Sequence, residues 1–243
     1  MSDSDSGAAD KHPLILLPGL LNDERLWTAQ RAALADRAEI HVPDLTRHES
    51  IGAMADAVLA EAPERFALAG LSMGGYVALA IMRQAPERVT GLALIDTSAA
   101  PDSEEGARAR RGMIDQAQHD FDGVIDTLLG KLLHERHQSD RALTASVRAM
   151  AHAVGVEGFR LQQQAIMARA DSWPTLATID CPVAVICGRE DGITPPEDHQ
   201  RMAEALADAQ YTVIDQCGHL APLEQPDRVN EALLAWWSRL PGA

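Results

Sequence analysis

The 243-residue sequence has few cysteines and no long apolar run. Its three cysteines, Cys181, Cys187 and Cys217, form no CxxC pair, so we expect neither a disulfide framework nor a cysteine-based zinc site. The longest apolar run, around Val77 and Ile81, is far shorter than the roughly 18–20 residues that a membrane span requires. The sequence therefore predicts no membrane partner.

Basic residues are scarce relative to acidic ones. The chain contains 21 Lys and Arg residues against 36 Asp and Glu residues, which gives a formal net charge of −15 at pH 7. A nucleic-acid partner would require a basic face, so none is expected. Residues 1–10 are rich in Ser, Asp and Gly and lack the positive start and apolar stretch of a secretory signal. We therefore predict a cytoplasmic protein with a disordered tail at residues 1–11.

The sequence does contain short apolar runs that alternate with amphipathic stretches. Six of these runs are predicted to be buried strands because they are short, apolar and separated by helical patterns or turn residues. They are residues 14–17, 39–42, 66–69, 92–95, 183–187 and 211–214. Ile51, Met54, Ala55, Val58 and Leu59 show the spacing of an amphipathic helix. This alternation predicts an α/β fold with a mostly parallel, doubly wound sheet.

One long segment breaks the alternation. Between residues 101 and 176 the sequence shows helical patches and no convincing strand. We predict that residues 101–176 form a helical cap, inserted into a core made of residues 12–100 and 177–243. Its first residues, 101–106, are predicted to be a loop because they contain Pro, Asp, Ser and Gly.

A serine lies at the junction between a predicted strand and a predicted helix. Gly70, Ser72 and Gly74 match the G-x-S-x-G pattern of a nucleophile elbow, in which glycines two residues before and after the serine permit a very sharp turn. The following helix directs free backbone N–H groups towards developing negative charge. We therefore predict Ser72 as a nucleophile and the N–H of Met73 as an oxyanion donor.

A second oxyanion donor is expected in the turn after the first predicted strand. The segment containing Pro18, Gly19, Leu20 and Leu21 follows that strand. Neighbouring parallel strands end at the same edge of a sheet, so this turn is expected to lie beside Ser72. We predict the N–H of Leu20 as the second donor, although an ordinary Pro-Gly turn would give the same local sequence.

A histidine and an aspartate follow the last two predicted strands. His219 lies between Gly218 and an apolar stretch, which indicates a tight, partly buried loop suited to a general base. Asp191 follows residues 183–187 and is predicted to orient that histidine. Glu190 and Asp96, which also follow predicted strands, are the competing acids. The order Ser, Asp, His along the chain resembles that of the α/β-hydrolases. It differs from the orders found in chymotrypsin and in subtilisin.

These features together resemble the α/β-hydrolase superfamily over nearly the whole chain. The matching segments are LLPGLLNDERLW, GLSMGG, ALIDTSA, GREDGITPP and CGHLAPLEQPDRV. Within the superfamily the chain is most similar to small carboxylesterases, enol-lactone hydrolases and methyl-ester esterases. Many members have His-Gly after the first core strand, where this chain has Pro18-Gly19. Members similar to haloalkane dehalogenases place an aspartate at the position of Ser72, so that chemistry is disfavoured.

The resemblance implies a serine hydrolase that cleaves a small, largely apolar ester, lactone or thioester and needs no metal or organic cofactor. C–C bond hydrolases, acyltransferases, perhydrolases and cofactor-free dioxygenases use the same scaffold and remain alternatives, as does a non-catalytic ligand-binding protein. Apolar side chains, mainly of the cap, are predicted to line the substrate pocket. They are Leu21, Met113, Phe121, Leu128, Met150, Phe159, Met167 and Leu220.

Overall fold

The computed structural model describes residues 11–242, so the predicted tail lies outside the described residues except for its last position. Within this range six strands form one sheet in which all neighbouring strands are parallel. They are β1 (His12–Leu17), β2 (Ala38–His41), β3 (Phe66–Leu71), β4 (Val89–Ile95), β5 (Val183–Gly188) and β6 (Ala209–Ile214). Their order across the sheet is β2-β1-β3-β4-β5-β6. The predicted α/β class and parallel sheet are therefore confirmed.

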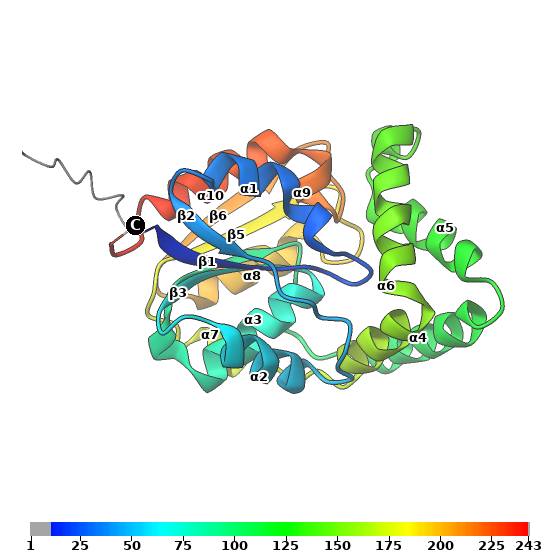
Figure 1. Ribbon diagram of the computed structural model, residues 1–243, viewed down its shortest axis with the longest axis horizontal. Coiled ribbons are helices and arrows are strands. Elements are labelled where there is room, and N and C mark those ends of the chain that lie inside the picture. Colours follow the sequence, from blue (N-terminus) through cyan, green and yellow to red (C-terminus); the bar gives the residue numbers. More distant parts are fainter. Residues whose placement is uncertain (1–10, 243) are drawn as a thin grey trace, which may run out of the picture.

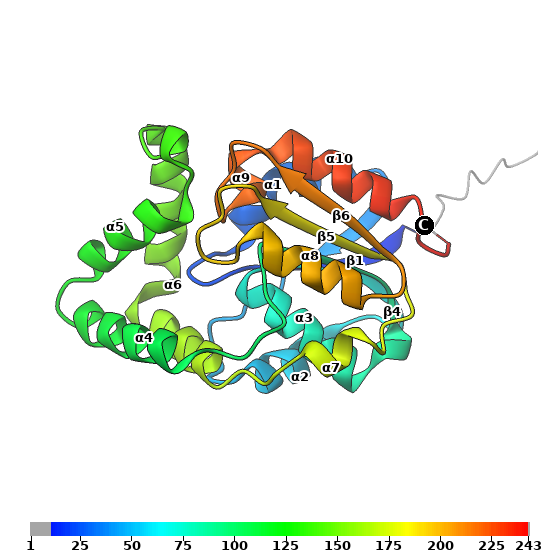
Figure 2. The same ribbon diagram turned by 180° about the vertical axis from the view of Figure 1, so that it is seen from behind.

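Helices cover both faces of the sheet (Figures 1 and 2). Around the sheet lie α1 (Thr28–Leu34), α2 (Ile51–Glu61), α3 (Met73–Gln84), α7 (Trp173–Leu176), α8 (Pro196–Ala205), α9 (Ala221–Glu224) and α10 (Pro226–Trp237), with the short 3₁₀ helices η1 (Glu24–Trp27) and η2 (Pro86–Arg88). Helices α1 and α10 lie on one face, whereas α2, α3 and α8 lie on the other. This is the doubly wound arrangement that the sequence predicts.

The alternating side chains of β1 show how the two layers form. Leu14 and Leu16 pack into the hydrophobic core beneath α1 and α10. Ile15 and Leu17 point the other way, into the core that includes α2 and α3. Because successive side chains of a strand face opposite sides, a continuous apolar run fits only a strand that is covered on both faces.

The predicted helical insertion lies between β4 and β5. It consists of α4 (Glu104–Ala117), α5 (Phe121–Leu132), η3 (Glu135–His137) and the long helix α6 (Arg141–Met167). Gly155 has a positive φ of 71°, and α6 is kinked there. Figures 1 and 2 show these helices standing beyond one end of the sheet. This end carries the loops after β1 and β6, because α6 and α5 are hydrogen-bonded to residues of those loops.

Two details at the ends of the insertion bear on the predicted cap of residues 101–176. The predicted loop at residues 101–106 is wrong in its second half, because α4 already begins at Glu104. The Ser103 side chain accepts a hydrogen bond of 2.9 Å from the N–H of Gly106 and so caps the helix. At the other end, α7 packs against α3 and α8 of the sheet layers.

Among the described residues, no helix is both long and apolar enough to span a membrane.

Candidate functional site

Ser72 lies in the sharp turn between β3 and α3, where its backbone adopts φ 53° and ψ −114°. A non-glycine residue in this region of φ and ψ is strained and persists only where the surrounding structure imposes it. Here the N–H of Ser72 donates to the Ile95 carbonyl at 2.9 Å, and the hydroxyl of Thr97 donates to the Ser72 carbonyl at 2.8 Å. Strand β4 and the residues after it therefore hold the serine in its strained conformation.

The two flanking glycines are required by close backbone packing. A Cβ atom on Gly70 would overlap the carbonyl group of Gly74. A Cβ atom on Gly74 would overlap the carbonyl group of Leu17 in β1. The structure thus places a turn between two neighbouring strand ends that is too crowded for any side chain at these two positions.

His219 contacts both Ser72 and Asp191. Its Nε2 lies 2.9 Å from the Ser72 Oγ, and its Nδ1 lies 2.8 Å from the Asp191 Oδ2. An ionised carboxylate only accepts hydrogen bonds, so Nδ1–H donates to Asp191 and the lone pair of Nε2 faces the serine hydroxyl. His219 and Asp191 are only 2% and 3% exposed, so this relay lies largely out of contact with water.

The charged form of Asp191 is stabilised in spite of burial. Burial alone would raise the pKa of this carboxyl, but the His219 charge and hydrogen bonds from His219 and Thr194 together lower the pKa to about 2. The Thr194 hydroxyl donates to Asp191 Oδ2 at 2.7 Å. The backbone N–H groups of Ile193 and Thr194 donate to the other carboxylate oxygen at 2.8 and 3.1 Å. Asp191 therefore faces His219 as a fixed negative charge.

The two competing acids make other contacts. Asp96 is fully buried and accepts hydrogen bonds from the N–H groups of Gly188, at 2.9 Å, and Ala221, at 3.0 Å. Burial and the nearby charge of Asp191 raise the pKa of Asp96 well above its ordinary value. Glu190 accepts a hydrogen bond from the N–H of Cys217 at 3.0 Å. Neither carboxylate is hydrogen-bonded to His219.

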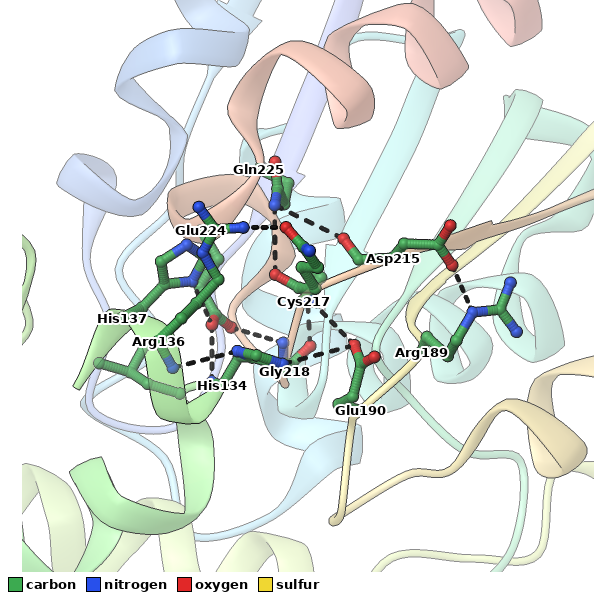
Figure 3. A network of polar contacts seen from close by, with 12 residues as sticks. His134, Arg136, His137, Arg189, Glu190, Asp215, Cys217, Gly218, Glu224 and Gln225 are labelled. Atoms are coloured by element: carbon green, nitrogen blue, oxygen red, sulfur yellow. Dashed lines mark hydrogen bonds and ion pairs between the residues drawn. The ribbon is translucent and has the colours of Figure 1, made fainter.

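The loop that carries His219 is held by a buried carboxylate, shown in Figure 3. Glu224 Oε1 accepts hydrogen bonds from the N–H groups of Gly218 at 3.0 Å and Leu220 at 3.2 Å. Its Oε2 accepts from the N–H of His134 at 2.7 Å and from the His137 Nδ1 at 2.9 Å. One carboxylate thus joins the insertion to the residues on both sides of His219.

The two predicted oxyanion donors lie at the ends of neighbouring strands β1 and β3. The N–H groups of Leu20 and Met73 form no hydrogen bond with any of residues 11–242. By contrast, the N–H of Leu21, whose φ is 59°, donates to the Gln162 Oε1 of α6 at 3.0 Å. The arrangement leaves two backbone donors near Ser72 free to bind an oxygen atom.

Ser72 and His219 open into a cavity of about 200 Å³ beneath α4 and α5. Leucine, isoleucine and methionine side chains form most of its wall, together with Tyr76. Four of the eight predicted pocket residues line it: Leu21, Met113, Leu128 and Leu220. A small organic molecule with an apolar portion fits such a cavity.

The other four predicted pocket residues lie away from the cavity wall. Met150 and Phe159 are fully buried inside the insertion, where they pack against its other helices. Phe121 packs against Phe159, with 5.9 Å between the ring centroids. Met167 is the last residue of α6 and is not part of the wall. Helical spacing indicates which apolar side chains pack inward, but it does not distinguish packing between helices from exposure to a cavity.

Three site residues are not predicted from the sequence. Gln162 and Arg110 contact or line the site and come from segments without a recognisable motif. Thr194 lies in the segment GREDGITPP, and its hydroxyl contacts Asp191. The spacing of Thr194 three residues after Asp191 is the one clue, because a short side chain there can bond back to the carboxylate. Among residues 11–242, no group of three or more His, Cys, Asp or Glu side chains is placed to hold a metal ion.

Comparison with known proteins places this geometry in context. Residues 14–232 match the protein family described as "Alpha/beta hydrolase family". A relative from Pectobacterium carotovorum subsp. carotovorum, named pimeloyl-[acyl-carrier protein] methyl ester esterase, is 29% identical over 238 residues, which cover 92% of this chain and 93% of the relative.

Solved structures show the same fold. A thermophilic esterase from Thermogutta terrifontis, solved with malate bound, has a TM-score of 0.87 and 32% identity, and the match covers 93% of this chain and 89% of that one. The enol-lactonase from Burkholderia xenovorans LB400 has a TM-score of 0.85 and 22% identity, covering 94% and 92% of the two chains. At that identity the second likeness concerns the fold alone.

Proposed function

The chain belongs to the α/β-hydrolase family, and from this premise we propose that it cleaves a small carboxylic ester through a covalent acyl intermediate on Ser72. The observation that carries this proposal is the continuous relay from the Ser72 Oγ through His219 to Asp191, with distances of 2.9 and 2.8 Å. The names of its relatives, a methyl ester esterase and a thermophilic esterase, support an ester as the substrate.

In the first half of the reaction, Ser72 attacks the ester carbonyl. The Nε2 of His219 takes the hydroxyl proton as the Ser72 Oγ bonds to the carbonyl carbon. The carbonyl oxygen becomes an oxyanion, which accepts hydrogen bonds from the N–H groups of Leu20 and Met73. The protonated His219 then gives its proton to the departing alcohol oxygen, and the acyl group stays on Ser72.

The second half repeats these steps with water. His219 removes a proton from a water molecule, whose oxygen attacks the acyl carbon. The oxyanion forms again at the same two N–H groups, and the carboxylic acid leaves as Ser72 regains its proton from His219. Asp191 stays ionised throughout, because its lowered pKa favours the negative charge that stabilises the transient imidazolium.

The cavity supports a small acyl or alcohol group as the second part of the proposal. Its volume of about 200 Å³ and its largely aliphatic wall match a short apolar chain beside the reacting carbonyl. Burial of each methylene of such a chain contributes roughly 0.8 kcal/mol to binding. We therefore expect kcat/KM to rise with chain length until the cavity is filled.

A substrate panel tests the proposed function. Esters, lactones and thioesters of short acids are supplied to the wild type and to Ser72→Ala, with product release as the readout. We expect at least one class to be hydrolysed and Ser72→Ala to lower kcat by about 10⁴-fold or more. Ser238→Ala, at an exposed serine after α10, is the matched control and is expected to keep full activity. Equal activity of wild type and Ser72→Ala would reject the proposal.

A further inference from the structure

The wall of the active-site cavity has a charge opposite to that of the whole chain. The protein carries 36 acidic and 21 basic residues. Yet Arg110 of α4 and Lys131 of α5 line the cavity. Within residues 11–242, no aspartate or glutamate lines it. A cavity with basic groups in a low-dielectric wall attracts anions, whereas the rest of this acidic molecule repels them.

Arg110 lies on the stripe of α4 that faces the cavity. Gly106, four residues before it, and Met113, three residues after it, lie on the same helix face and line the same wall, as does the adjacent Ala109. The Arg110 side chain is 20% exposed, so most of its surface has been removed from bulk water. Burying such a charge is costly unless hydrogen-bonding or ionic partners surround it. The partners that Arg110 has within the protein therefore show which of its donors are left for a ligand.

Two of the three guanidinium nitrogens of Arg110 are occupied by the protein. Its Nε donates to Asp102 Oδ2 at 3.2 Å, and its Nη1 donates to the Oε1 of the fully buried Gln163 at 2.8 Å. Its Nη2 forms no hydrogen bond with any of residues 11–242. The group is thus fixed in orientation while one nitrogen keeps its donors available.

Asp102 does not neutralise this cation. Its other oxygen, Oδ1, accepts a hydrogen bond from Arg169 Nη1 at 3.0 Å. Arg169 is itself fixed, because its Nε donates to the Ala100 carbonyl at 2.9 Å and its guanidinium lies 4.5 Å from the centre of the Tyr76 ring. One carboxylate therefore faces two guanidinium groups, and the cluster keeps one net positive charge beside the cavity.

Lys131 adds a second positive charge to the same wall. It is exposed on α5 and forms no ion pair with any of residues 11–242. A flexible ammonium group at this position is able to approach a ligand held by the fixed guanidinium. The two cations come from different helices of the insertion, so the site is built by the way α4 and α5 pack.

We propose that the cavity binds a free carboxylate carried by the substrate, with Arg110 as its main partner and Lys131 as an auxiliary charge. Resting on the proposed ester hydrolysis, this inference narrows the substrate class to esters with a second, ionised carboxyl group, such as half-esters of dicarboxylic acids. A guanidinium N–H forms a strong, directional hydrogen bond with a carboxylate oxygen. The aliphatic part of the wall accommodates the chain between that carboxylate and the ester at Ser72.

The test compares charged and neutral esters of equal length. Methyl half-esters of the dicarboxylic acids from succinic to suberic acid are paired with methyl esters of monocarboxylic acids, and methanol release is measured. For the best chain length, the wild type is expected to show a kcat/KM at least about tenfold higher for the half-ester than for the neutral ester. A tenfold difference is about what one charge-assisted hydrogen bond contributes. Arg110→Gln is expected to lower that preference to about one, when the preference is taken as the ratio of kcat/KM for the half-ester to kcat/KM for the neutral ester of the same variant.

Arg111→Gln is the matched control, because Arg111 is an exposed neighbour on α4 that does not line the cavity. It is expected to keep the wild-type preference. Inhibition of the wild type by unesterified dicarboxylates provides a second readout that does not depend on the folding of a variant. These acids are expected to inhibit competitively and at least about tenfold more strongly than monocarboxylates of equal length.

The outcomes separate this inference from the proposed function. If the wild type hydrolyses neutral esters and half-esters with equal kcat/KM, through Ser72, the anion site is overturned but the esterase proposal stays intact. The same holds if Arg110→Gln keeps the full preference or if dicarboxylates inhibit no better than monocarboxylates. Failure to hydrolyse any ester rejects the proposed function, and binding of dicarboxylates to Ser72→Ala, measured by calorimetry, still decides whether the anion site exists.

Discussion

The Gln162 side chain accepts a hydrogen bond of 3.0 Å from the backbone N–H of Leu21, and it thereby joins helix α6 to the loop that carries the proposed oxyanion donor Leu20. The same side chain donates to the Leu45 carbonyl at 3.3 Å and is fully buried. Leu21 has a φ of 59°, a conformation that leucine adopts only under constraint. The insertion thus both covers the cavity and helps to fix the backbone of the site.

Replacing Gln162 should affect catalysis more than binding. In Gln162→Leu the N–H of Leu21 loses its acceptor, the loop relaxes, and the Leu20 N–H moves away from the oxyanion. We expect kcat to fall by about 10–100-fold with little change in KM, somewhat less than loss of a whole oxyanion donor. Gln162→Glu keeps an acceptor for Leu21 and should recover part of the rate. Gln164→Leu, on the same helix, is the control, and an unchanged kcat in Gln162→Leu would contradict this role.

Replacing Asp191 by asparagine should remove most of the activity without unfolding the protein. The asparagine amide can donate to the Nδ1 of His219, which favours the tautomer whose Nε2 carries the proton and cannot accept one from Ser72. We expect kcat to fall by about 10³–10⁴-fold. Steady-state kinetics check the result, and Asp215→Asn, at an exposed aspartate paired with Arg189, is the control. A loss of less than tenfold would show that another group orients the histidine.

Asp96 should matter for stability because it joins the loop that carries Asp191 to the loop that carries His219. It accepts the N–H groups of Gly188 and Ala221, which precede Asp191 and follow His219 along the chain. Asp96→Ala leaves both buried donors without a partner, so we expect the free energy of unfolding to fall by about 2–6 kcal/mol, at about 1–3 kcal/mol per donor. Urea titration measures this change. A loss below about 1 kcal/mol would contradict the bridging role.

His199 should make stability depend on pH. Its Nε2 accepts the N–H of Thr97 at 2.9 Å, and burial lowers its pKa below the ordinary value of 6.5. At pH values between the folded-state pKa and 6.5, the unfolded chain therefore binds more protons than the folded one. The contribution of His199 is fully present above about pH 6.5 and is lost as the pH falls below it, by at most about 1.4 kcal/mol per pH unit.

The variant His199→Gln isolates this effect, because glutamine does not titrate. Unfolding free energies from urea titrations between about pH 8 and pH 5 should show a smaller decrease for His199→Gln than for the wild type. His119→Gln, at an exposed histidine in the turn after α4, should behave like the wild type. Parallel pH curves for the wild type and His199→Gln would contradict the lowered pKa.

The sheet and the position of Ser72 could be predicted because they depend on local pattern. Strand β1 is apolar at every position from Leu14 to Leu17 because both of its faces are covered. Gly70 and Gly74 mark the sharp turn because any Cβ at these positions would overlap backbone atoms. In both cases one stretch of sequence carries the whole physical requirement.

Other parts of the site depend on contacts between distant segments. Gln162 contacts Leu21 across 141 residues, and Asp96 contacts Ala221 across 125. Arg110 lies on a helix whose local sequence gives no reason to distinguish it from its neighbour Arg111. Likewise, periodicity shows that Phe159 is buried but not that it faces other helices of the insertion instead of the cavity. Such roles become visible only when the segments are placed in space.

Covalent labelling tests the central claim most directly. A fluorophosphonate reacts with a serine hydroxyl that a neighbouring base activates, and mass spectrometry of the intact and digested protein locates the adduct. We expect one adduct per chain on Ser72 in the wild type, and none in Ser72→Ala or His219→Ala under the same conditions. Labelling at another residue, or equal labelling of Ser72 in the wild type and His219→Ala, would contradict the proposal that His219 activates Ser72.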